Sequence, residues 1–223
     1  MKFDIVIWGA SSFAGQYIVE HLFNSYSGQY RIALAGRDKL KLEQVKQNLG
    51  LSDAEIIVGD ACDQQFLQLL ANQTRLIIST VGPYALYGEP LIKACVEAGI
   101  DYCDLTGEPQ WIWSMLAKYE QQAKVSGARI LHCCGFDSIP SDLGVYHLQE
   151  LAFKNTGQYC QQIHYRFKNS KGGFSGGTVA TMLNAIEQIA GDKTQARLLK
   201  TPYALLPEKS SNLPYQKSVK GIE

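Results

Sequence analysis

The 223-residue chain is 46% hydrophobic and 19% charged, which is ordinary for a globular protein and enough for one good-sized domain and part of another. Its 21 basic and 21 acidic residues cancel, which argues against nucleic acid as a partner. No apolar run reaches the length of about 18 residues that a membrane span needs, and the basic start of a signal peptide is missing. We therefore expect a cytoplasmic protein without a membrane span, and peripheral membrane contact stays open. The six cysteines form no C-x-x-C pair, so no metal site is expected.

The chain begins with a pattern of strand, glycine turn and helix. The apolar run Ile5–Ile7 predicts a strand buried on both faces, and Gly9 ends it. A helix should start at Phe13, with its apolar stripe formed by Phe13, Tyr17, Ile18, His21 and Leu22. Such a turn leaves free backbone N–H groups near the positive end of the helix dipole, where an anion binds.

The spacing of this turn is Gly9-x-x-Ser12-x-x-Gly15, the layout of a dinucleotide-binding turn. The predicted diphosphate-binding residues are Gly9, Ser11, Ser12, Phe13, Ala14 and Gly15. Serine at position 12 lets the backbone approach a diphosphate less freely than glycine would, while its hydroxyl offers a hydrogen-bond donor. The alternative is an ordinary strand–helix turn that binds nothing.

A second strand over 30–35 ends in Gly36-Arg37-Asp38. An arginine at this position accommodates the 2′-phosphate of NADP, whereas an acidic residue would bind the 2′-hydroxyl of NAD. Because Arg37 comes first, we predict NADP as the cofactor, with NAD as the alternative. Asp38 suits the N-cap of the next helix. Arg37 could equally be a solvated surface residue.

Two further strand ends carry candidate binding residues. The third strand, 55–58, leads to Asp60, which would either contact the adenine or cap the following helix. The fourth, 76–80, leads into Val81-Gly82-Pro83-Tyr84, a candidate wall beside the nicotinamide half of the cofactor. Tyr84 is a weak candidate for a proton donor, and a packing role is the alternative.

The strands and helices continue to alternate. Helices are expected over 87–99 and 111–126, the latter carrying Trp113 and Leu116 in the core or at an interface, so a homodimer stays open. Strands are expected over 101–105 and 129–133. After the last of these strands Asp137 is a weak candidate for handling a proton, and a helix follows from Pro140 to about Leu151. His132 lies inside a predicted strand, which favours a core role.

This alternation predicts a Rossmann-like, doubly wound parallel α/β domain over residues 1–150. A second, α+β domain should begin over 151–200, with an antiparallel-type strand at 161–167 and a helix through Met182 and Leu183. The residues from 201 to 223 show no period, which predicts an irregular tail.

Five stretches together resemble the saccharopine dehydrogenase-like oxidoreductases, which include the trans-acting enoyl reductases of bacterial lipid synthesis. They are residues 9–15, 35–37, 80–84, 102–108 and 134–142, and the resemblance runs to about residue 190. It implies an NAD(P)-dependent oxidoreductase that transfers hydride between NADP(H) and an undetermined small or lipid-linked substrate. Members are typically about twice this length, and no catalytic residue can be carried over from them.

Two alternatives to a working oxidoreductase remain. One is a nucleotide-binding scaffold or sensor without turnover, which the short second domain and Ser12 favour. The other is an accessory protein of an enoyl reductase in lipid biosynthesis, which would contact a membrane peripherally.

Overall fold

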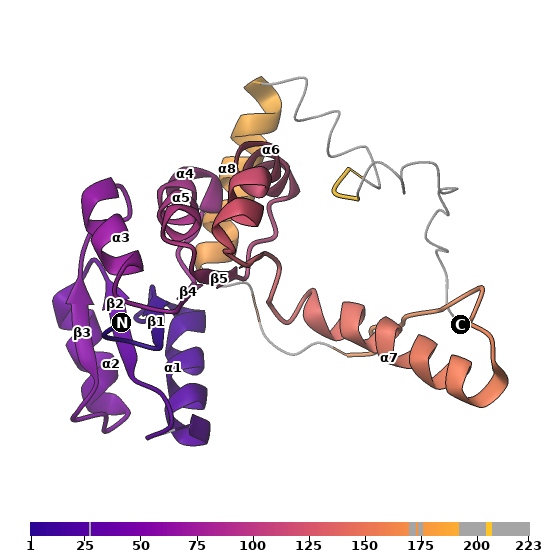
Figure 1. Cartoon of the computed structure of the whole chain (residues 1–223), viewed down its shortest axis with the longest axis horizontal. Helices are drawn as coiled ribbons and strands as arrows, with labels where there is room; N and C mark the ends of the chain where they lie inside the picture. Colours follow the sequence, from indigo (N-terminus) through magenta and orange to yellow (C-terminus); the bar gives the residue numbers. More distant parts are fainter. Residues whose placement is uncertain (27, 170–172, 174–175, 192–203, 207–223) are drawn as a thin grey trace.

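A computed structural model describes residues 1–26, 28–169, 173, 176–191 and 204–206. Its centre is one parallel sheet with the strand order β3-β2-β1-β4-β5-β6 (Figure 1). The strands are β1 (Ile5–Trp8), β2 (Ile32–Gly36), β3 (Glu55–Val58), β4 (Leu76–Ser79), β5 (Asp101–Asp104) and β6 (Ile130–Leu131). The order reverses between β1 and β4, as in a doubly wound sheet. The predicted Rossmann-like α/β fold is therefore confirmed.

Helices cover both faces of this sheet. They are α1 (Phe13–Tyr26), α2 (Lys39–Asn48), α3 (Gln64–Ala71), α4 (Tyr84–Tyr87), α5 (Glu89–Ala98), α6 (Pro109–Ser126), α7 (Ile139–Thr156) and α8 (Gly176–Gly191). The buried residues of α1 and α2 share one hydrophobic cluster, and those of α3, α5 and α6 share another. None of the described helices has both the length and the apolar run that crossing a membrane requires.

The central strand β1 divides its side chains between these two clusters. Val6 and Trp8 pack with the cluster of α3, α5 and α6, and Ile7 packs with the cluster of α1 and α2. Successive side chains of a strand point to opposite faces, so an uninterrupted apolar run fits a strand that is covered on both sides. All three side chains are almost completely buried, and each such burial contributes about 1.5–3 kcal/mol.

The stripe predicted for α1 is wrong at three of its five positions. Phe13, Tyr17 and His21 are exposed, whereas Gly15 and Val19 are buried. The reason is the close approach of the helix to the turn, since a Cβ on Gly15 would lie 2.2 Å from the carbonyl oxygen of Gly9. This contact directs the Gly15 side of α1 toward the sheet.

Two predicted elements also differ in extent. The helix expected over 87–99 is divided at Gly88, where a Cβ would lie 2.5 Å from the Trp111 ring. The strand expected over 129–133 is only two residues long. It ends because the backbone N–H of Cys133 donates to the side chain of Asp104, and Cys133 itself has a left-handed φ of 59°.

The region after residue 138 departs most from expectation. Helix α7 extends away from the sheet and has no buried residue (Figure 1). The strand predicted at 161–167 is wrong, because this segment is irregular and no second sheet pairs with it among the described residues. Helix α8 forms as predicted. The tail predicted from 201 lies outside the described residues except for 204–206.

Candidate functional site

A cavity of about 550 Å³ opens at the carboxyl ends of β1, β2 and β4. This is the point at which the strand order reverses, where doubly wound sheets bind their ligands. Eight of the twelve predicted cofactor-binding residues line it: Gly9, Ser11, Ser12, Arg37, Asp60, Val81, Gly82 and Pro83. The other four, Phe13, Ala14, Gly15 and Tyr84, lie next to these in sequence but outside its lining.

Gly9 forms the floor of the cavity. Its φ of 88° belongs to the left-handed region, which a residue with a Cβ rarely adopts. A Cβ at this position would lie 2.5 Å from Thr80 Oγ1 and 2.8 Å from Val81 Cγ2. The backbone therefore comes as close to the end of β4 as glycine permits, and Thr80 and Val81 occupy the place that a side chain would need.

The turn after Gly9 leaves three backbone donors free among the described residues. The N–H groups of Gly9 and Ala10 donate to the carbonyl of Ala35, and that of Ser12 donates to the carbonyl of Gly9. The N–H of Gly15 donates to Ser12 Oγ at 2.9 Å. The N–H groups without an acceptor are those of Ser11, Phe13 and Ala14, as expected for the first turn of a helix.

Ser12 acts as the N-cap of α1 and contacts the end of β4. Its Oγ lies 2.8 Å from Thr80 Oγ1, and Thr80 Oγ1 donates to the carbonyl of Gly9 at 2.9 Å. A hydroxyl carries one proton, so Ser12 donates to Thr80 when Thr80 donates to Gly9. In this arrangement the Ser12 hydroxyl stabilises the turn rather than offering a donor to the cavity. Thr80 also lines the cavity, although it was not among the predicted cofactor-binding residues.

The end of β2 places two cations at the cavity, Arg37 and Lys41. Arg37 is exposed and has no ion pair within the described residues. Asp38 is the N-cap of α2, as predicted: its Oδ1 accepts from the N–H of Lys41 at 3.2 Å, and its Oδ2 lies 3.6 Å from Lys41 Nζ. Asp38 thus bonds within the chain, whereas the exposed guanidinium of Arg37 has no such partner among the described residues and suits a phosphate.

Asp60 lies on the far side of β2, after β3. Its Oδ1 accepts from the N–H of Cys62 at 2.7 Å, which closes a turn. The N-cap of α3 is Asp63, whose side chain accepts from the N–H of Phe66. The prediction that Asp60 caps this helix is therefore wrong, and contact with the adenine stays a prediction.

The loop after β4 passes through a cis peptide between Gly82 and Pro83 and then enters α4. Tyr84 is buried beneath it, donates from its hydroxyl to the carbonyl of Ser79 at 3.0 Å, and packs against Trp111. Burial, with a further contribution from Asp104, raises the pKa of Tyr84 well above its ordinary value. These contacts do not favour Tyr84 as a proton donor, because its proton is already engaged inside the protein.

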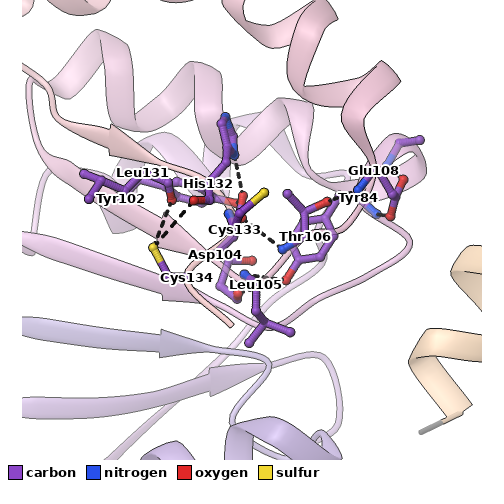
Figure 2. A network of polar contacts seen from close by, with 12 residues as sticks. Tyr84, Tyr102, Asp104, Leu105, Thr106, Glu108, Leu131, His132, Cys133 and Cys134 are labelled. Carbon is purple, nitrogen blue, oxygen red and sulfur yellow. Dashed lines mark hydrogen bonds and ion pairs between the residues drawn. The ribbon is translucent and has the colours of Figure 1, made fainter. Parts of the chain in front are cut away.

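A second polar network joins the ends of β5 and β6 around Asp104 (Figure 2). Asp104 is 1% exposed, and its Oδ1 accepts from the N–H groups of Thr106 and Cys133. Its Oδ2 accepts from the Tyr102 hydroxyl at 3.0 Å and lies 2.7 Å from His132 Nδ1. His132 is thus a histidine with a buried carboxylate partner. The two residues are 28 positions apart in the chain, which explains why the pair could not be recognised from the sequence.

Asp137 is exposed on the segment between β6 and α7 and does not line the cavity. A Cβ on Gly135 would lie 2.8 Å from its Oδ1, so the carboxylate folds back over its own turn. Neither weak candidate for proton transfer, Tyr84 or Asp137, therefore reaches the cavity in this structure.

Comparison with known proteins agrees with this geometry. Residues 5–131 match the family described as the saccharopine dehydrogenase NADP binding domain. A protein of Mycobacterium tuberculosis is 42% identical over 212 residues, which are 94% of this chain and 50% of that protein. A trans-acting enoyl reductase of Mycobacterium ulcerans is 40% identical over 213 residues, 94% of this chain and 51% of its own. The chain thus spans about half the length of the curated relatives it matches.

The fold has a counterpart among solved structures. Apo saccharopine dehydrogenase from Saccharomyces cerevisiae aligns with 70% of this chain and 32% of its own, at a TM-score of 0.54 and 16% sequence identity. At that identity the likeness shows the fold alone.

The residues at the cavity fit an NADP molecule. Gly9 leaves room for a close backbone approach, three N–H groups are free, and Arg37 and Lys41 supply positive charge. The prediction of NADP as cofactor is confirmed by the family match. The chain belongs to the saccharopine dehydrogenase NADP-binding domain family.

Proposed function

We propose that this chain is an NADP-dependent oxidoreductase that reduces an enoyl group on a small or lipid-linked substrate. When bound, NADPH supplies the hydride for such a reduction. The names of the relatives that are 40–41% identical support the enoyl substrate class. The homodimer and the peripheral membrane contact stay predictions.

One observation carries this proposal: a single cavity connects the glycine turn, the cations after β2 and the loop after β4. We take the free N–H of Ser11, which lines the cavity, and those of Phe13 and Ala14, which follow just beyond its lining, as the donors to a diphosphate. Arg37 and Lys41 face a 2′-phosphate, and Gly82 and Pro83 form a wall for the nicotinamide. Each part of the cofactor thus has a matching part of the cavity.

A nucleotide-binding scaffold or sensor is the second candidate function. It is favoured by the positions of Tyr84 and Asp137, because neither side chain lines the cavity. Binding of NADPH without its oxidation, across a panel of enoyl thioesters and imines, would support this candidate over the reductase.

The proposed cofactor preference is tested by unfolding the protein with NADPH and with NADH. A ligand at a hundred times its Kd adds roughly 2.7 kcal/mol to the free energy of unfolding. We expect a clear rise in Tm with NADPH and a smaller one with NADH at equal concentration. Arg37→Ala should remove the difference, because the charge facing the 2′-phosphate is lost.

Lys39→Ala is the matched control for this experiment. Lys39 is a cation two residues farther along, pairs with Glu43 at 3.7 Å and does not line the cavity. It should keep the NADPH preference of the wild type. Equal stabilisation of the wild type by both nucleotides would contradict the role of Arg37, and no stabilisation by either would contradict nucleotide binding.

A further inference from the structure

Glu108 is a buried carboxylate without a cationic partner among the described residues. It is 2% exposed, and no Lys, Arg or His of the described chain forms an ion pair with it. Its two oxygens accept from backbone donors instead, Oε1 from the N–H of Tyr84 at 2.8 Å and Oε2 from the N–H of Ala85 at 2.9 Å. Burying a carboxylate is unfavourable unless such hydrogen bonds compensate, so its position calls for an explanation.

The explanation lies in the sequence of the loop after β4. Pro83 occupies the N-cap position of α4, and proline has no side-chain acceptor to bind the first N–H groups of that helix. Glu108 supplies the acceptor from 24 residues away. Figure 2 shows its carboxylate beside Tyr84, on the other side of Thr106 from the Asp104 network.

This contact fixes the part of the cavity wall that precedes it. Gly82 and Pro83 line the cavity after β4, whereas Arg37 lines it after β2. Since β1 lies between β2 and β4, these two parts are on either side of the glycine turn. A shift of the Pro83–Tyr84 backbone would therefore move one end of the cavity and leave the other in place.

Glu108 also contacts α8. The Thr181 hydroxyl donates to Glu108 Oε1 at 3.4 Å, and a Cβ on Gly82 would lie 3.6 Å from Thr181 Oγ1. The first turn of α8 reaches the cavity through Gly177. One carboxylate thus connects the loop after β4 with the helix that closes the same end of the cavity.

We propose that Glu108 is the positioning residue for the nicotinamide half of NADP(H), acting through the Gly82–Pro83 loop and α8. The inference rests on the proposed function, because it takes the loop to be the nicotinamide wall. A carboxylate suits this role, since it presents two acceptors to two adjacent N–H groups. A glutamine side chain of the same shape presents one acceptor and one donor, so Glu108→Gln loses one bond and places a donor against a donor.

Isothermal titration with two ligands tests the inference. NADPH spans the whole cavity, whereas 2′-phospho-ADP-ribose has the adenine, the 2′-phosphate and the diphosphate but no nicotinamide. For Glu108→Gln we expect the Kd of NADPH to rise roughly tenfold, about the effect of one charge-assisted hydrogen bond. The Kd of 2′-phospho-ADP-ribose should stay unchanged, which a general loss of structure would not allow.

Glu89→Gln is the matched control. Glu89 is a partly buried glutamate of α5 whose carboxylate bonds to Lys118 and Tyr119, away from the cavity lining. It should leave both dissociation constants at the wild-type values. Thr181→Val keeps Glu108 and removes only the contact with α8, so it should weaken NADPH binding alone and by a smaller factor. If Glu108→Gln does not fold, the Kd of NADPH for Thr181→Val tests the role of Glu108 instead.

The outcomes separate this inference from the function on which it rests. Equal weakening of both ligands in Glu108→Gln, or no weakening of either, overturns the role of Glu108 while the proposed function stands. If Glu108→Gln is unfolded, unchanged NADPH binding by Thr181→Val likewise overturns the role of Glu108 while the proposed function stands. A wild-type protein that binds neither ligand overturns the proposed function and the inference together.

Discussion

Gly9 combines a backbone conformation and a close contact that both require the absence of a side chain. Its φ of 88° is left-handed, and its nearest neighbours would clash with a Cβ. These are separate costs, because the first belongs to the residue and the second to the packing of β1 against the end of β4. At Gly127 the backbone is also left-handed, but no neighbour would clash with a Cβ, so only the backbone cost applies there.

We predict that Gly9→Ala lowers the free energy of unfolding by about 2–5 kcal/mol. Left-handed backbone costs a residue with a Cβ about 1–2 kcal/mol, and overpacking adds about 1–3 kcal/mol. Urea unfolding measures the sum, and titration of the folded fraction with NADPH should show lost binding.

Gly127→Ala is the control that separates the two costs. Gly127 has a φ of 80° at the C-cap of α6, and nothing lies within 4 Å of the Cβ that would be added. It should lose only the roughly 1–2 kcal/mol of backbone strain. If both variants lost the same amount, the close approach between Gly9 and Thr80 would not hold.

At the scale of an element, β5 carries one aspartate at each end, and the two differ in environment. Asp101 pairs with the exposed guanidinium of Arg129, whose proximity lowers the pKa of Asp101. Asp104 is buried and joins four groups from β5, the loop after β5 and the segment that follows β6. Because β6 stops after two residues, the side chain of Asp104, rather than backbone hydrogen bonds of the sheet, connects β5 to His132 and Cys133.

We predict that Asp104→Asn lowers the free energy of unfolding by about 3 kcal/mol or more. The amide turns one of two fully used acceptors into a donor and leaves buried groups without partners. Urea denaturation measures this loss, and the chemical shifts of the His132 ring should change with it.

Asp101→Asn makes the same substitution on the same strand. An ion pair of this exposure is worth less than about 1 kcal/mol, so this variant should stay near the wild type. A loss of similar size in both variants would mean that Asp104 has no special part in joining β5 to β6.

At the scale of the whole molecule, the hydrophobic core belongs to the residues before α7. Among the described residues, the buried members of both clusters lie between Phe3 and Met115, and their partly buried neighbours reach to Cys133. Helix α7 has no buried residue. The sheet with its helices α1 to α6 should therefore be a folding unit, whereas α8 contributes to one end of the cavity.

We predict that a chain of residues 1–138 folds cooperatively and binds 2′-phospho-ADP-ribose like the full chain. NADPH should bind this shorter chain more weakly, because Gly177 and the Thr181 contact are gone. Circular dichroism during urea unfolding tests cooperativity, and titration calorimetry tests binding. A broad, non-cooperative transition would show that α7 and α8 are needed for the core.

A feature of the fold or of the site could be predicted from the sequence when the residues that form it lie close together in the chain. The strands β1 to β5, the Gly9 turn and the N-cap at Asp38 depend on residues a few positions apart, so their patterns can be recognised in the sequence. The exposed start of α1 was missed because the approach of Gly15 to Gly9 decides which face of the helix turns inward. The prediction of a strand at 161–167 was wrong: an alternating pattern specifies a strand only where a partner pairs with it, and none of the described strands does.

Local patterns in the chain were enough to predict the Rossmann-like sheet, the glycine turn after β1 and the NADP cofactor, because periodicity and turn chemistry act within short segments. Binding of a diphosphate at this turn and of a 2′-phosphate at Arg37 stay predictions. The contacts that hold the cavity in shape became visible only in the three-dimensional arrangement of the chain. The Ser12–Thr80 contact spans 68 residues, Asp104 and His132 are 28 apart, and Glu108 caps α4 from 24 residues away. These side chains meet because parallel strands bring their carboxyl ends to one edge of the sheet, and the spacing of residues along a chain does not report that proximity.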